Sequence, residues 1–141
     1  MTAHPLLERL KSSRVPIADL VGFAVEPIGD GEALGWLEAG PQHANPMGTL
    51  HGGVLCDVVD AAMGCAYASR LDEGESFTTL ELKINFLKPV WSGLLTARSR
   101  VVRGGRTVGL VECDVLDEGG SLVARASSTC MTLRGELASG R

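Results

Sequence analysis

The segment from about Gly53 to Ser69 constrains the fold more than any other part of the chain, because it is apolar on nearly every side when wound as a helix. At about 100° per residue, valine, leucine, alanine and other apolar side chains cover most of the circumference. Only a narrow strip remains, and it holds Asp57, Asp60 and Gly64. A helix of this kind is normally buried, so the rest of the chain has to cover it.

Four apolar segments follow this helix and are predicted to be strands. In the first, leucine, isoleucine and phenylalanine alternate with threonine, glutamate, lysine and asparagine, which is typical of a strand with one buried face. Pro89 and two glycine pairs separate the segments, as in antiparallel hairpins. The predicted ranges are 77–88, 92–103, 106–117 and 121–133.

The part of the chain before the long helix predicts a short helix over residues 3–13 and then two strands. A tight turn at Gly29-Asp30-Gly31 joins these strands, and a loop rich in Pro, Asn and Gly covers residues 40–50. One long helix and about six strands form an α+β pattern in which the helix lies against one face of the sheet. The 141 residues suit a single domain, residues 1–141, with its core at about 20–133.

Composition excludes several classes of function. The net charge is −4 and the basic residues are scattered, which argues against a nucleic-acid-binding protein. No apolar run is long enough to span a bilayer, and Glu8, Arg9 and Lys11 interrupt what a signal peptide would need, so we expect a cytoplasmic protein without membrane contact. The histidines lack metal-ligand spacing, and the cysteines form no CxxC pair, so we predict no metal and buried, unpaired thiols. The cysteines are Cys56, Cys65, Cys113 and Cys130.

The two aspartates of the strip need separate explanations. A negative charge is favourable near a helix N-terminus, which accounts for Asp57 but fits Asp60 poorly, because Asp60 lies about two turns into the helix. Gly52 and Gly53 leave the backbone N–H groups at the helix start open to a ligand, although such a pair is also typical of a simple turn. A donor of this kind near a carboxylate forms a minimal acyl-transfer site.

Residues 45–66, NPMGTLHGGVLCDVVDAAMGCA, resemble the signature of hotdog-fold acyl-CoA thioesterases, in particular the phenylacetate-pathway (PaaI-type) branch of the 4-hydroxybenzoyl-CoA thioesterase superfamily. The family pattern is Asn or Gln, then His-Gly-Gly, then Asp or Glu eight residues beyond the first Gly. This chain has Asn45, His51-Gly52-Gly53 and Asp60 at those places. The resemblance implies a hotdog fold, in which a curved antiparallel sheet of about six strands wraps the long helix.

The resemblance also implies roles for individual residues. The Gly52 N–H would polarise the thioester carbonyl, and Asn45 would position the attacking water or the thioester. Asp60, reaching across from a partner subunit, would be the general base or the nucleophile. His51 would order the loop or take part directly. Thr79 matches a position where some relatives use Ser or Thr, but alternation places it opposite the leucine face, so it would need an edge or interface location.

The expected activity is hydrolysis of an aryl or medium-chain acyl-CoA to the carboxylate and free CoA, without a cofactor. Coenzyme A phosphates could contact cations in two turns, where Lys88, Arg103, Arg106 and Thr107 lie, but such residues are equally typical of solvated turns. The resemblance implies a homodimer through residues 77–88, or a homotetramer made of two dimers. The alternatives are a hotdog dehydratase and a non-catalytic hotdog protein that binds acyl-CoA.

Overall fold

The computed structural model describes residues 4–12 and 15–141 and contains one six-stranded antiparallel sheet. The strand order is β1-β2-β4-β5-β6-β3, so β1 and β3 are the two edges. The strands are β1 (Phe23–Gly29), β2 (Glu32–Ala39), β3 (Ser76–Phe86), β4 (Gly93–Gly104), β5 (Val108–Leu116) and β6 (Leu122–Leu133). The helices are α1 (Pro5–Ser12), α2 (Pro16–Val21) and α3 (Gly52–Ala68), with short 3₁₀ turns η1 (Pro41–His43) and η2 (Gly135–Ala138).

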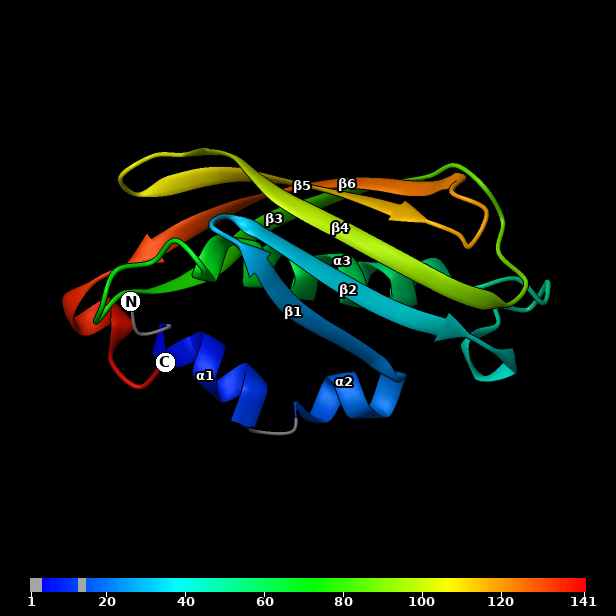
Figure 1. Cartoon of the computed structure of the whole chain (residues 1–141), viewed down its shortest axis with the longest axis horizontal. Helices are drawn as coiled ribbons and strands as arrows, with labels where there is room; N and C mark the ends of the chain where they lie inside the picture. The colour runs from blue at the N-terminus through cyan, green and yellow to red at the C-terminus, as the bar shows by residue number, and fades with distance from the viewer. Residues whose placement is uncertain (1–3, 13–14) are drawn as a thin grey trace.

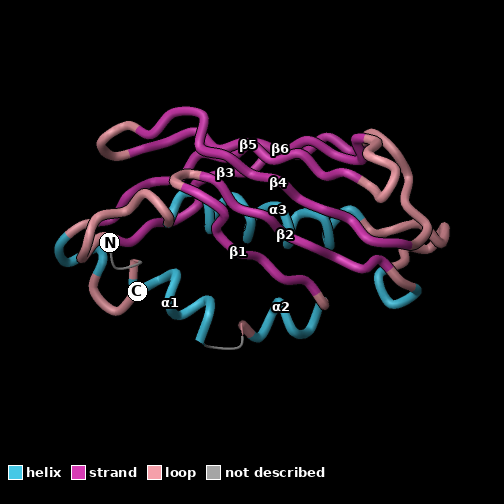
Figure 2. Tube along the Cα trace, in the orientation of Figure 1, coloured by secondary structure: helices cyan, strands magenta, loops and turns pink. Residues whose placement is uncertain are grey.

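The sheet arches over α3, which forms the centre of the molecule (Figures 1 and 2). Every residue from Ala62 to Ala68 is buried, whereas the first half of α3 is partly open. Buried aliphatic side chains from β2, β4, β5 and β6 pack with α3 in one hydrophobic core. The predicted α+β architecture, a long helix wrapped by a curved sheet of about six strands, is confirmed.

The ends of α3 agree with the sequence prediction to within one residue. His51 is the N-cap, and its Nδ1 accepts a hydrogen bond from the Gly53 N–H at 2.9 Å. Ser69 is the C-cap, and its Oγ donates to the Ala66 carbonyl. The hydrogen bonds at both ends satisfy backbone groups that a helix leaves without internal partners.

The N-terminal region contains one helix that the sequence analysis missed. The predicted helix over 3–13 corresponds to α1, and residues 3 and 13 lie outside the described residues. Helix α2 covers residues for which the sequence analysis predicted no helix. Its signals are Pro16 in the first turn and Gly22 at the end, where φ is +92° and the Gly22 N–H donates to Ala18. Proline at the start and glycine after the end are typical of a helix.

Strand β3 contains a bulge that changes which side chains face α3. Its pairing with β6 shifts between Thr79, opposite Cys130, and Glu81, opposite Thr129, so Leu80 is the extra residue. Continuous alternation would put Thr79 on the face away from Leu82, as the sequence analysis expected. That expectation is wrong, because the bulge places Thr79 on the same inward face as Leu82 and allows it to contact α3.

Candidate active site

Strand β3 lies along the strip of α3 that the apolar side chains leave open, and the two run in opposite directions. At the helix start, a Cβ on Gly52 would lie 2.6 Å from the Phe86 ring. Further along, a Cβ on Gly64 would lie 3.0 Å from the Phe77 ring. These glycines therefore let an aromatic side chain of the strand approach the helix backbone closely.

Between these two contacts, the Thr79 hydroxyl donates a hydrogen bond to Oδ1 of Asp60 at 3.1 Å. Asp60 is exposed, and no ion-pair partner for it occurs within residues 4–12 and 15–141. Because β3 is an edge strand, no further strand covers this carboxylate. The structure thus brings together two of the predicted site residues, and one carboxylate oxygen of Asp60 stays available for chemistry.

Asp57 lies one helical turn before Asp60 and is half-buried. Burial raises the pKa of the neighbouring Cys56 thiol, and the negative charges of Asp57 and Asp60 raise it further. The side chains of this strip therefore interact electrostatically, although only Asp60 has a hydrogen bond that orients its carboxylate toward the sheet edge.

The loop before α3 is held in shape by Asn45. Its Oδ1 accepts from the N–H groups of Met47 at 3.0 Å and Thr49 at 3.1 Å, and its Nδ2 donates to the Thr49 hydroxyl at 2.8 Å. Gly48 closes the turn with a φ of +91°. Asn45 therefore organises the loop, and one N–H of its amide is left for a substrate or water.

His43 and His51 connect this loop to the rest of the fold. The buried His43 ring accepts from the Gly40 N–H at Nδ1 and donates from Nε2 to the Val21 carbonyl at 2.6 Å. The His43 carbonyl accepts from the His51 N–H at 2.8 Å. Because the cap at His51 uses the Gly53 N–H, the amide of Gly52 is left without a partner in the described part of the chain. The Gly52 N–H is the donor to which the family resemblance assigns polarisation of the thioester carbonyl.

A cavity of about 380 Å³ opens beside Gly52. We call it the apolar cavity. It is lined by Asn45, Thr49, Leu50, Gly52, Leu55, Phe86, Leu87, Lys88, Pro89 and Val90. Of the polar groups in its wall, Lys88 is bound to Asp117 by an ion pair of 2.6 Å. The hydrogen bond from Lys88 is the main cause that lowers the pKa of Asp117.

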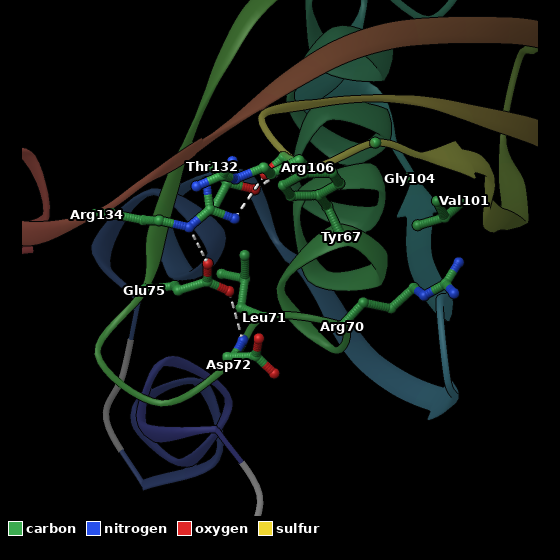
Figure 3. Close-up of a pocket in the computed structure, with 11 residues that line it drawn as sticks. Tyr67, Arg70, Leu71, Asp72, Glu75, Val101, Gly104, Arg106, Thr132 and Arg134 are labelled. Atoms are coloured by element: carbon green, nitrogen blue, oxygen red, sulfur yellow. Dashed lines mark hydrogen bonds and ion pairs between the residues drawn. The ribbon is translucent and has the colours of Figure 1, made fainter.

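A second cavity, of about 280 Å³, lies at the other end of α3 (Figure 3). We call it the arginine cavity, because Arg70, Arg106 and Arg134 line it. Figure 3 shows Arg134 and Glu75 on one side, joined by an ion pair of 2.6 Å, and Arg70 on the other. Arg134 also donates to the Arg106 carbonyl, while the Arg106 guanidinium has no partner among the described residues.

The residues considered for coenzyme A phosphates are therefore not grouped in one chain. Lys88 is at the apolar cavity and Arg106 is at the arginine cavity. Arg103 is exposed and lies opposite Leu110 of β5, and Thr107 is exposed in the turn that follows Arg106. Within one chain, Lys88 and Arg106 lie at opposite ends of α3 and do not share a phosphate.

Comparison with known proteins agrees with this geometry. The sequence profile of the thioesterase superfamily matches residues 47–124, which include the glycines at the start of α3, Asp60 and Thr79. The chain belongs to the thioesterase superfamily. The resemblance read from residues 45–66 is thereby confirmed at the level of the family.

Individual members of the superfamily show how far the likeness extends. The chain is 39% identical over 87 residues to a Saccharolobus solfataricus protein named as an esterase, covering 62% of this chain and 61% of the relative. It spans 57% of a second such protein from that organism. It is 26% identical over 102 residues to the 1,4-dihydroxy-2-naphthoyl-CoA hydrolase of Listeria monocytogenes, covering 72% and 83% of the two chains.

Among solved structures, a phenylacetic acid degradation-related protein of Ralstonia eutropha is 32% identical to this superfamily member, with a TM-score of 0.79. The match covers 89% of this chain and 98% of that chain. No helix within residues 4–12 and 15–141 is long and apolar enough to cross a membrane.

Two residues that support the site were not identified as such from the sequence. Phe86 was assigned only to the inner face of a strand, and His43 only to a loop. The adjacent Gly52 and Gly53 are a signal for Phe86, because side-chain-free positions at a helix start allow close approach. No sequence signal distinguishes His43, whose bonding partners Val21 and Gly40 meet only after folding.

Cys56 provides a test of the charges on the strip. Changing Asp60 or Asp57 to Asn removes a negative charge, which lowers the pKa of Cys56 and increases its thiolate fraction. We therefore expect alkylation by iodoacetamide at a fixed, mildly alkaline pH to become faster. The measurement is the alkylation rate in the native protein. Burial raises the pKa of Cys65 to about 11 and that of Cys113 to about 12, which keeps these thiols protonated.

Glu73→Gln is the matched control, because it removes one charge from an exposed loop residue away from the strip. Its alkylation rate should equal that of the unmodified chain. Equal rates in all three variants would show that the carboxylates do not act on Cys56.

Proposed function

We propose that the protein hydrolyses aryl or medium-chain acyl-CoA thioesters at a site formed between two copies of the chain. The observation that carries this proposal is the Asp60–Thr79 hydrogen bond under an open sheet edge, together with the free Gly52 amide. Gly52 and Asp60 are eight residues apart in α3, which is about 12 Å along a helix that rises about 1.5 Å per residue. One chain therefore cannot direct both groups at one carbonyl.

Pairing of β3 with β3 of a second copy brings Asp60 of one copy close to Gly52 of the other. A two-fold axis near Leu82 places Glu81 opposite Lys83 of the second copy, and opposite charges across a ladder stabilise it by about 0.2–1 kcal/mol. Thr79 then faces Asn85 of the second copy, at a strand spacing of about 4.8 Å. An unpaired strand of this length also needs a partner, because exposed edges promote uncontrolled association.

The same pairing brings the two halves of the site together. Thr79 holds Asp60, and Phe86 contacts Gly52, so Asp60 of one copy approaches Gly52 of the second copy. The Gly52 N–H, at the positive end of the helix dipole, stabilises the negative charge that develops on the thioester oxygen. Hydrolysis then proceeds with Asp60 in one of two roles.

As a general base, Asp60 accepts a proton from water while the water oxygen bonds to the carbonyl carbon. The carbon–sulfur bond then breaks, and the departing thiolate takes up the proton. As a nucleophile, Asp60 forms an anhydride and expels the thiolate, and water then hydrolyses the anhydride. In both routes the Thr79 hydroxyl holds Oδ1 and leaves the other carboxylate oxygen to act.

In this assembly, the nucleotide end of coenzyme A binds at the arginine cavity. The arginine cavity lies near the start of β3, which the proposed pairing sets beside the end of β3 of the second copy. Arg106 has an uncompensated charge there, whereas the charge of Lys88 is neutralised by Asp117. We therefore assign phosphate contact to Arg106 rather than to Lys88.

A dehydratase and a non-catalytic acyl-CoA-binding protein are the two alternatives. The combination of a free helix-start amide with an oriented, solvent-accessible carboxylate favours hydrolysis over binding alone. Release of free thiol from a panel of acyl-CoA thioesters, from acetyl to palmitoyl and including phenylacetyl and hydroxybenzoyl, distinguishes hydrolysis from both alternatives. A dehydratase changes the acyl chain without releasing thiol, and a binding protein changes nothing.

Asp60→Asn tests the central residue. The substitution keeps the size of the side chain but removes its charge and basicity, so we expect kcat to fall by about 10²–10⁴-fold. Asp57→Asn removes an equal charge one turn away, and we expect it to keep most of the activity and to change the free energy of unfolding by at most about 1 kcal/mol. Thiol release and urea denaturation measure the two quantities.

The contrast between the variants decides the assignment. Both should keep the same oligomeric state by light scattering, which excludes loss of the shared site as the cause. Loss of kcat in Asp57→Asn with activity retained in Asp60→Asn would move the catalytic carboxylate by one turn. Activity retained in both variants would contradict a carboxylate mechanism.

Arg106→Ala tests the nucleotide contact. Because a phosphate contact far from the thioester stabilises ground state and transition state alike, we expect KM for acyl-CoA to rise while kcat changes little. Acyl-pantetheine substrates, which lack the nucleotide, should be indifferent to the change. Equal loss of kcat/KM with both substrates would show that Arg106 does not contact the nucleotide end.

A further inference from the structure

We propose that the apolar cavity binds the acyl group of the substrate, that this group is an uncharged hydrocarbon or aryl group, and that Phe86 sets the length that fits. This inference rests on the proposed thioesterase function and adds to it the part of the fold that selects the substrate. Its basis is the composition of the cavity wall and the contact between Phe86 and Gly52.

The two arms of a thioester have opposite requirements. The pantetheine arm carries amides that need hydrogen-bond partners, and the nucleotide beyond it needs cations. The acyl arm, when it is a hydrocarbon, gains from burial against apolar surface. A cavity that opens at the Gly52 amide can hold only one of these arms, so its chemistry identifies the occupant.

Two N–H groups in the wall of the apolar cavity are free within the described part of the chain, that of Gly52 and one of the Asn45 amide, and the family resemblance assigns both to the reacting end of the thioester. The polar side-chain groups that remain are engaged. Asn45 and Thr49 bond to each other, and Asn45 Oδ1 also accepts two backbone N–H groups. Lys88 is paired with Asp117. The rest of the wall is hydrocarbon from leucine, valine, proline and phenylalanine side chains. Arg106, whose guanidinium has no partner among the described residues, lies by contrast at the arginine cavity.

The size of the cavity narrows the substrate class further. Its volume of about 380 Å³ is near the lower end of the range of about 300–1,000 Å³ that is usual for ligand pockets. A single aromatic ring or a chain of medium length fits such a space. This agrees with the aryl or medium-chain substrate inferred from the family resemblance.

Phe86 lies where the cavity meets Gly52, whose amide is assigned to the reacting carbonyl. Its ring lines the cavity and also touches Gly52, so closely that even a Cβ at that position would collide with it. Because Phe86 is the last residue of β3 and is 55% exposed, its ring can be replaced with limited effect on the core. A smaller side chain there lengthens the cavity on the side of the thioester.

The test compares kcat/KM across a series of straight-chain acyl-CoA substrates for the unmodified protein, Phe86→Leu and Phe86→Ala. Each methylene that the enlarged cavity can bury favours the longer substrate by about fourfold in kcat/KM. We therefore expect the optimum to move to longer chains, further in Phe86→Ala than in Phe86→Leu. Melting temperatures show that each variant is folded, and Phe86→Leu keeps the test valid if Phe86→Ala does not fold.

Phe23→Leu is the matched control, because Phe23 is a buried phenylalanine on β1, at the opposite edge of the sheet, and lines neither cavity. It should lower the melting temperature and leave the ratio of long-chain to short-chain kcat/KM unchanged. A uniform change in KM at every chain length in the Phe86 variants would assign the cavity to pantetheine and overturn the proposal. No thiol release by the unmodified protein would overturn the proposed function instead.

Discussion

Helix α3 is apolar on nearly every side, and a single sheet has to cover it. The curved sheet buries the second half of the helix completely, and its edge at β3 stops above the one strip that is not apolar. Asp60 lies on that strip and remains accessible because no strand follows β3. The requirement to bury the helix thus produces both the core and the exposed carboxylate at its margin.

Hydrophobic periodicity was sufficient to predict most of the fold. The long helix, its boundaries and the strands after it follow from patterns that local sequence carries, and Asn45, Gly52 and Asp60 follow from one contiguous motif. Helix α2 was missed because its six residues are too few for a periodic signal, although proline and glycine mark its ends.

The bulge at Leu80 could not be predicted, since Leu80 continues the apolar alternation of the strand without interruption. Only the pairing with β6 shows that Thr79 faces inward, toward Asp60. The positions of Lys88 and Arg106 relative to each other could not be predicted from the sequence for a related reason. In the sequence, Lys88 and Arg106 are both predicted to lie in turns. Only the structure shows that they lie at opposite ends of α3 and that Lys88 forms an ion pair with Asp117.

Complementation between two inactive variants tests the shared site most directly. Asp60→Asn removes the carboxylate, and Gly52→Ala adds a methyl group 2.6 Å from the Phe86 ring, which displaces the helix-start amide from the thioester oxygen, so neither should act alone. Refolding an equal mixture gives half mixed dimers, each with one intact site. The account predicts recovery of about one quarter of the unmodified activity. No recovery, with mixed dimers demonstrated by differently tagged chains, would contradict a site formed between two copies.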